Sequence, residues 1–188
     1  KAAGVYAGYL EKKADRAERL LQDAATLAER AAAAAPGYAN AHYFHAFVLG
    51  RYSQRISVLK ALAEGHATRV RRSLDRALEL EPKHADAHVA LGLYHAEIVA
   101  KVGGLAARLT YSASADAAER HFERAIALNP DSPVGALEYA NGLVAMHGAK
   151  ARQRALDLYR RAADSTPADA MERLDAERAR QALAAGAR

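Results

Sequence analysis

The chain has 188 residues, of which 51% are hydrophobic and only 6% aromatic, with alanine the commonest hydrophobic residue. It carries 27 Lys and Arg against 22 Asp and Glu, a formal net charge of +5. No cysteine is present, which excludes disulfides and thiolate metal sites. No run of about 18 apolar residues occurs, so no membrane span is expected. The length suits one domain or one short helical array built from good helix formers.

Hydrophobic spacing and capping residues predict helices, in chain order, at 5–34, 38–50, 53–80, 84–102, 115–128, 132–147, 150–164 and 168–184. Ser53 and Ser114 are candidate N-caps, and Pro133 suits the first turn of its helix. Gly65 is the weak point of the long third helix and is expected to bend or split it. Residues 103–114 are an insertion that we expect to form a loop or short helix over one end of a groove. The last helix is rich in charged residues, as the polar cap of a helical array is.

Prolines recur along the chain at Pro36, Pro82, Pro130 and Pro167, each at the end of a predicted helix. An alanine stands five residues before each proline. Eight residues before the prolines stand Ala28, Leu74, Phe122 and Tyr159, and twelve before them stand Ala24, Val70, Ala118 and Ala155. This pattern resembles the second helix of a tetratricopeptide (TPR) repeat, whose standard unit is about 34 residues. The first two proline intervals are longer, so we predict insertions between the two helices of those units.

The TPR resemblance implies an all-α, right-handed solenoid of helical hairpins, with extended repeats and a C-terminal capping helix. We predict a single domain, 1–188, divided into a leading half repeat (1–36), three repeats (37–82, 83–130 and 131–167) and a capping helix (168–188). In each full repeat a large residue precedes a tiny one, namely Ala46, Gly92 or Ala140. Only the second repeat has the Leu-Gly pair of the family pattern. The tiny residues are expected to let the second helix pack closely against the first.

Two blocks, residues 50–65 and 85–97, resemble a narrower group of TPR proteins with long second helices. That group comprises the T-component of TRAP transporters and, more distantly, the regulator of microtubule dynamics proteins. The first resemblance implies a bacterial helical bundle with a ligand-accepting cleft, periplasmic and oligomeric. The chain begins with Lys1 rather than Met and has no lipobox cysteine. We therefore leave the compartment open between cytoplasm and periplasm and expect the N-terminus to be truncated.

The groove positions of TPR proteins can be carried onto this sequence through the first helix of each repeat. They fall on Tyr43, Phe47 and Arg51 in the first repeat, on Val89, Leu93 and Glu97 in the second, and on Leu137 and Asn141 in the third. We interpret them as a mixed apolar groove for a partner's peptide helix or extended segment. The alternative is that some of them pack beneath the insertions. Carboxylate-clamp TPR proteins have Lys and Asn where Tyr43 and Phe47 stand, so binding of a chaperone C-terminus is not expected.

Three tyrosines, Tyr94, Tyr111 and Tyr139, could point their phenols into a cleft. The alternative function is therefore a small-ligand-binding protein of the TRAP T-component kind, with Tyr111 on a moving lid. A third alternative is a homo-oligomeric scaffold that assembles through the alanine-rich leading helix. An open groove favours binding of a protein segment, whereas a closed apolar cavity favours the small ligand.

Histidines at helical spacing raise the possibility of a zinc site. His42 and His45 are three residues apart, and His84 and His88 are four apart. Two of them stand where the repeat has a large packing residue, so structural packing is the simpler explanation, and a pH-sensitive role is a further alternative. We expect no metal and no cofactor.

Arginines at 69, 72 and 76 form a stripe that could bind phosphates, although pairing with nearby carboxylates is the simpler explanation. No aromatic-interleaved motif accompanies them, so no nucleic-acid partner is expected. GxSxG, Walker A and GxGxxG motifs are absent, as is a cysteine nucleophile. We therefore expect a binding protein rather than an enzyme.

Overall fold

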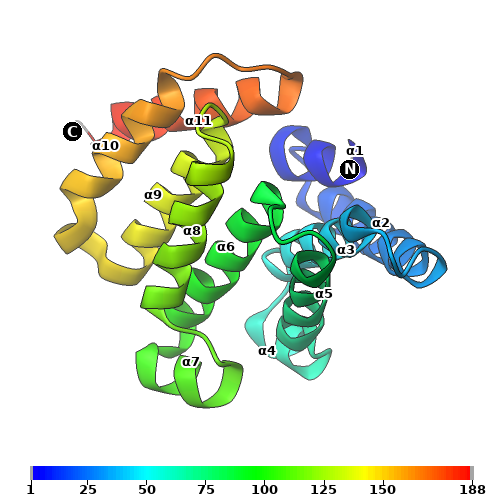
Figure 1. Ribbon diagram of the computed structural model, residues 1–188. Coiled ribbons are helices and arrows are strands. Elements are labelled where there is room, and N and C mark those ends of the chain that lie inside the picture. Colours follow the sequence, from blue (N-terminus) through cyan, green and yellow to red (C-terminus); the bar gives the residue numbers. More distant parts are fainter. Residues whose placement is uncertain (1, 187–188) are drawn as a thin grey trace. The chain divides into compact units, whose positions relative to one another are not determined.

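The computed structural model describes residues 2–186, which fold into helices joined by short turns and contain no strand (Figure 1). The all-α prediction is confirmed. The chain divides into two compact units, residues 1–90 and 91–188, with the boundary inside helix α6 (Ala85–Val102). The predicted single domain, the repeat boundaries and the right-handed solenoid stay predictions.

The first unit contains α1 (Ala2–Val5), the π-helix η1 (Tyr6–Leu10), α2 (Ala14–Ala34), α3 (Ala39–Ser53), α4 (Val58–Ala63), α5 (His66–Leu80) and the start of α6. Helix α3 packs against both α2 and α5. The core of this unit includes Ala7, Leu21 and Leu49. These residues bring η1, α2 and α3 together.

Two long helices predicted in the first unit are interrupted. Gly65 has a left-handed φ of 64° and separates α4 from α5, so the prediction of a split there is confirmed. Ser53 ends α3 instead of capping the next helix, and its hydroxyl donates to the Leu49 carbonyl at 2.7 Å. The predicted helix 5–34 breaks at Glu11, whose carboxylate accepts the Lys13 N–H at 3.0 Å.

The second unit contains the rest of α6, followed by α7 (Gly104–Tyr111), α8 (Ala115–Leu128), α9 (Pro133–His147), the 3-10 helix η2 (Gly148–Ala151), α10 (Arg152–Ala163) and α11 (Ala170–Gly186). Ser114 caps α8 by accepting the Ala117 N–H at 3.2 Å, and Pro133 opens α9, as predicted. Within residues 2–186, no helix combines the length and the apolar character that crossing a membrane requires.

The proline-offset pattern holds in three of the second helices and fails in α2. In α5, α8 and α10 the alanines five residues before the prolines are buried. Ala31 of α2 is exposed instead, because the buried face of that helix runs through Ala17, Leu21 and Ala25 at four-residue spacing. The packing of α2 is thus set by α3 and the leading segment rather than by the repeat pattern.

The turns after the first two prolines are tied by equivalent hydrogen bonds, and the turn after the third by a different one. The Nε2 atoms of His42 and His88 lie 3.0 and 3.2 Å from the carbonyl oxygens of Pro36 and Pro82, six residues earlier in each case. A carbonyl oxygen only accepts, so each ring nitrogen donates. At the third turn Arg161 donates to the Pro130 carbonyl at 3.2 Å.

His84 has a capping role. Its Nδ1 accepts the Ala87 N–H at 3.2 Å, and its Nε2 lies 3.1 Å from the Asn40 side-chain oxygen. In the part of the chain that the structure describes, no three His, Asp or Glu side chains are grouped so that they could hold a metal. The contacts of His42, His84 and His88 agree with the structural explanation of these residues.

The arginine stripe of α5 is largely paired. Arg69 lies 2.9 Å from Glu29 of α2, and Arg76 lies 3.0 Å from Glu79. Arg72 is exposed and has no ion pair among the described residues. One unpaired cation makes a weak phosphate site, so pairing with carboxylates accounts for most of the stripe.

Phe122 of α8 is packed between two helices that lack side chains where they meet it. A Cβ on Gly92 of α6 would lie 2.8 Å from the ring atom Cδ1, and a Cβ on Gly142 of α9 would lie 2.9 Å from Cε2. Both distances are shorter than real contacts allow, so each position requires glycine unless the ring moves. The expectation that Gly92 lets α8 pack closely against α6 is confirmed.

We expect Gly92→Ala to lower the free energy of unfolding by about 1–3 kcal/mol, because the added methyl overpacks the buried Phe122 ring. Gly50→Ala is the matched control, since a Cβ at Gly50 of α3 meets nothing within 4 Å. Helix propensity predicts that this control gains up to about 1 kcal/mol. Urea denaturation followed by circular dichroism measures both values, and equal stability of the two variants would contradict the packing account.

Candidate functional site

In the first unit, the predicted groove residues Tyr43, Phe47 and Arg51 take part in intramolecular packing. Tyr43 is 6% exposed, and its ring centroid lies 4.9 Å from that of His84. The Arg51 guanidinium lies 5.6 Å from the ring centroid of Phe47 and 5.7 Å from that of Tyr9.

The leading segment covers this face of α3. A Cβ on Gly4 would lie 3.0 Å from Phe47 Cε1, so α1 passes directly over that ring. Ala7 is fully buried, and its carbonyl accepts from Arg55 at 3.2 Å. The family pattern places a groove on α3, but in this chain residues 2–10 fill the space beside Phe47 and Arg51. Their role in partner binding stays a prediction.

Polar side chains in the first unit also connect α3 to the start of α5. His66 is buried, with Nδ1 2.9 Å from Ser53 Oγ and Nε2 2.8 Å from a Glu64 carboxylate oxygen. Burial lowers the pKa of His66, and the Glu64 carboxylate opposes that shift. These contacts of Ser53, Glu64 and His66 tie the end of α3 to the turn around Gly65. The Ser53 hydroxyl also donates to the Leu49 carbonyl within its own helix.

In the second unit, four predicted site residues lie on or beside α6 and α7. The Tyr94 phenol donates to the Tyr111 carbonyl oxygen at 3.2 Å, which attaches the end of α7 to α6. Glu97 is half-buried and lies 3.3 Å from the Lys101 ammonium, and Leu93 is half-buried. Tyr94 and Tyr111 therefore meet through the phenol of one and the backbone of the other, rather than through two phenols.

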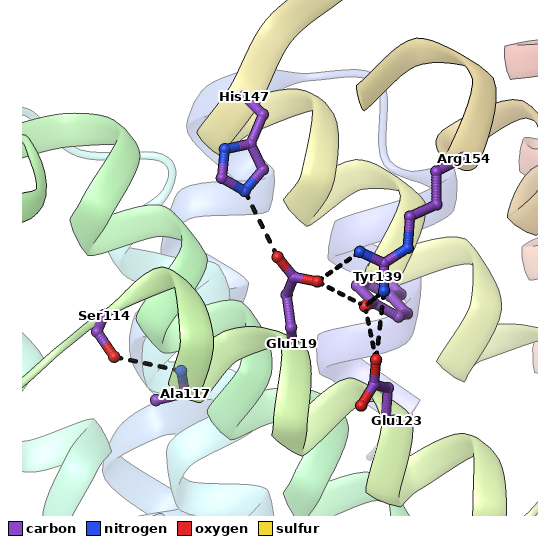
Figure 2. A network of polar contacts seen from close by, with 7 residues as sticks. All are labelled: Ser114, Ala117, Glu119, Glu123, Tyr139, His147 and Arg154. Atoms are coloured by element: carbon purple, nitrogen blue, oxygen red, sulfur yellow. Dashed lines mark hydrogen bonds and ion pairs between the residues drawn. The ribbon is translucent and has the colours of Figure 1, made fainter. Parts of the chain in front are cut away.

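Tyr139 of α9 is the centre of a polar network that joins α8, α9 and α10 (Figure 2). The residue is 3% exposed, and its ring stacks on Phe122 with 5.1 Å between centroids. Its hydroxyl oxygen lies 3.0 Å from a Glu119 carboxylate oxygen and 3.3 Å from one of Glu123. Because the hydroxyl has a single hydrogen, it donates to one carboxylate at a time.

Arg154 of α10 covers this network. Its guanidinium carbon lies 4.9 Å from the Tyr139 ring centroid, and its N–H groups donate to Glu119 at 2.5 Å, to Glu123 at 3.2 Å and to the Tyr139 hydroxyl (Figure 2). His147 lies 3.6 Å from the second oxygen of Glu119. One cation thus links two carboxylates of α8 across the phenol of α9.

Two groups of the network, Tyr139 and Glu119, have pKa values shifted away from neutral pH. Burial raises the pKa of Tyr139, and its hydrogen bond to Glu119 raises it further, so the phenol stays protonated. Burial also acts to raise the pKa of Glu119, but the hydrogen bonds from Arg154 and Tyr139 outweigh it and hold that pKa below its usual value. Such values are typical of a structural ion-pair network rather than of a group poised to transfer a proton.

An open groove of about 590 Å³ lies beside this network, between α8 and α10, and Tyr139 forms part of its lining. It is lined by Glu123, Ile126, Ala127, Pro130, Tyr139, Arg154, Asp157, Leu158 and Arg161. The four α10 residues have the spacing of one helix face. Ile126 and Leu158 supply apolar contact, while Asp157 pairs with Arg160 at 2.5 Å.

Of the predicted site residues, only Tyr139 lines this groove. Asn141 is exposed, donates to Glu138 at 2.9 Å and accepts from the Tyr159 hydroxyl at 2.7 Å, so it joins α9 to α10. Sequence reasoning missed Glu119, Glu123 and Arg154. The four-residue spacing of the two glutamates places them on one face of α8, which is the only sequence feature that points to them.

We expect Arg154→Met to lower the free energy of unfolding by about 1 kcal/mol at neutral pH, a small effect because the pair is half-exposed and screened by solvent. Glu119 has a lowered folded pKa, so its stabilising contribution is present above the unfolded value near 4.5 and is lost as the pH falls through the folded value. The difference between wild type and variant should therefore shrink on acidification below that unfolded value.

Urea denaturation over a range of pH measures this difference. Arg124→Met is the control, because Arg124 is an exposed α8 arginine with no ion pair among the described residues. A wild-type advantage over Arg154→Met that stays constant on acidification would show that Glu119 is not the partner that matters.

Comparison with known proteins gives one family for the whole chain. The family model described as "Regulator of microtubule dynamics protein 1-3" matches residues 1–185. No curated protein matches the chain. The all-helical fold is compatible with the helical-repeat architecture inferred from the prolines. The chain belongs to the regulator of microtubule dynamics protein 1-3 family.

Proposed function

We propose that this protein is a non-catalytic interaction module that binds a segment of a partner protein and acts in the regulation of microtubules. Support for the microtubule role comes from the family, whose name describes regulators of microtubule dynamics and whose model spans residues 1–185. Support for segment binding comes from the open groove between α8 and α10. The finer form of the proposal is that this groove holds the partner.

The composition of the groove suits a protein segment. Ile126, Leu158 and the Tyr139 ring offer apolar contact, while the charged side chains of the lining are mostly paired within the protein. A helix or extended segment with apolar anchors can lie in such a groove without leaving a buried charge unpaired. Affinity would then come from apolar contact and shape rather than from net charge.

A small ligand is the second candidate. The groove volume of about 590 Å³ lies within the usual range of small-molecule sites, about 300–1,000 Å³. The openness of the groove favours the protein segment, because a small molecule gains most affinity where it is largely enclosed. The absence of a catalytic role stays part of the proposal, and the pKa shifts of Tyr139 and Glu119, both directed away from neutral pH, support it.

Co-sedimentation of the full chain with microtubules polymerised from purified tubulin tests the proposal. Ala127 is exposed and lines the groove, so Ala127→Arg should obstruct the groove while leaving the core unchanged. Ala33→Arg, at an exposed alanine of α2, is the matched control. We expect wild type and Ala33→Arg to pellet equally with microtubules and Ala127→Arg to bind at least about tenfold more weakly, a loss of about 1.4 kcal/mol.

Two results would count against the proposal. If the wild-type protein does not pellet with microtubules at low salt, the proposal of direct microtubule binding is excluded. Equal binding of wild type and Ala127→Arg would leave the microtubule role in place and exclude the α8–α10 groove as the contact.

A further inference from the structure

Helix α7 presents two leucines to solvent. Leu105 is 76% exposed and Leu109 is 77% exposed, the highest values among the exposed large hydrophobic residues of the described chain. Their four-residue spacing places them on the same face of the helix. Single exposed leucines are ordinary on protein surfaces, but two on adjacent turns of an eight-residue helix form a small apolar patch.

The helix is held in place from its other side. Ala107 is fully buried, and its carbonyl accepts the Ala113 N–H at 3.0 Å. Turns with positive φ at Gly103 (81°) and Ser112 (50°) bracket the helix, and Tyr94 holds the Tyr111 carbonyl. Figure 1 shows α7 at one end of α6 and α8 in the second unit. The leucines are thus displayed by an anchored helix.

The stretch of chain that carries this patch has basic but no acidic residues. No acidic residue occurs between Glu97 and Asp116, while Lys101 and Arg108 lie within that stretch. Lys101 pairs with Glu97, but Arg108 is exposed and has no ion pair among the described residues. Leucines next to basic side chains, with no carboxylate between them in the sequence, complement a surface that has an anionic outer layer over an apolar interior.

We propose that α7 attaches the protein peripherally to an anionic lipid surface, with Leu105 and Leu109 inserted among the acyl chains and Arg108 at the headgroups. A bilayer accepts exposed side chains without needing a matching pocket, which favours it over a protein partner for this patch. Two leucines and one or two cations give weak, reversible and salt-sensitive binding. This surface is independent of the α8–α10 groove and of the proposed microtubule role.

Tryptophan fluorescence tests the proposal, because the chain has no tryptophan of its own. Leu109→Trp places a reporter on the patch. Leu27→Trp, at a leucine of α2 that is 64% exposed, is the matched control. The probes are vesicles of pure phosphatidylcholine and vesicles with about one third phosphatidylserine.

We expect the emission of Leu109→Trp to shift to shorter wavelength with phosphatidylserine vesicles, and less so at high salt or with Arg108→Ser added. Leu27→Trp should not shift. In vesicle flotation, the double change Leu105→Ser and Leu109→Ser should weaken binding at least about tenfold relative to wild type.

Three results would overturn the proposal. They are no vesicle-dependent shift of Leu109→Trp, an equal shift of Leu27→Trp, or a shift that grows with protein concentration in the absence of lipid. The last result would assign the patch to contact with a second copy of the chain.

Discussion

The ring of Phe122 fixes the arrangement of the second unit, since two helices approach it at glycines with no room for a Cβ. Gly92 and Gly142 let α6 and α9 close on the ring from different sides. Tyr139 stacks on that ring, and this contact places its phenol between Glu119 and Arg154. The position of Tyr139 in the lining of the α8–α10 groove therefore depends on core packing, and loss of the Phe122 ring would be expected to disturb the groove as well as stability.

The second unit presents two surfaces that differ in how their charges are balanced. In the groove, Arg154 is paired with Glu119 and Glu123, so a partner that binds there leaves these charges paired and gains its affinity from apolar contact. On α7 the exposed leucines have no cover and Arg108 has no pair among the described residues, so binding there depends on an oppositely charged surface. From this contrast we expect the groove and α7 to bind different ligands, and binding at α7 to weaken more strongly as salt is added.

Local sequence features predicted much of the fold. Helices near 115–128, 132–147 and 150–164 lie within a few residues of α8, α9 and α10, because periodicity and caps are local properties. The break at Glu11 was missed, since it depends on one carboxylate accepting the Lys13 N–H rather than on a glycine or proline at the break itself. Repeat spacing identified Gly92 as a small position and Phe122 as a large one, because each lies at a fixed distance from a proline.

The candidate site was predicted less completely. Tyr139 was predicted because its phenol could point into a cleft. Arg154 and Glu119 are 35 residues apart, and sequence spacing shows which face a residue occupies rather than which helix lies against it. Phe47 and Arg51 were carried over from the family pattern, which does not include a leading segment lying on α3.

Hydrogen–deuterium exchange of the full chain, with and without microtubules, tests the central claim most directly. The account predicts slower exchange in α8 and α10 on addition of microtubules, with little change in α2 or α11. Protection confined to α2, α3 or α7, or no protection at a microtubule concentration that pellets the protein, would contradict binding through the α8–α10 groove.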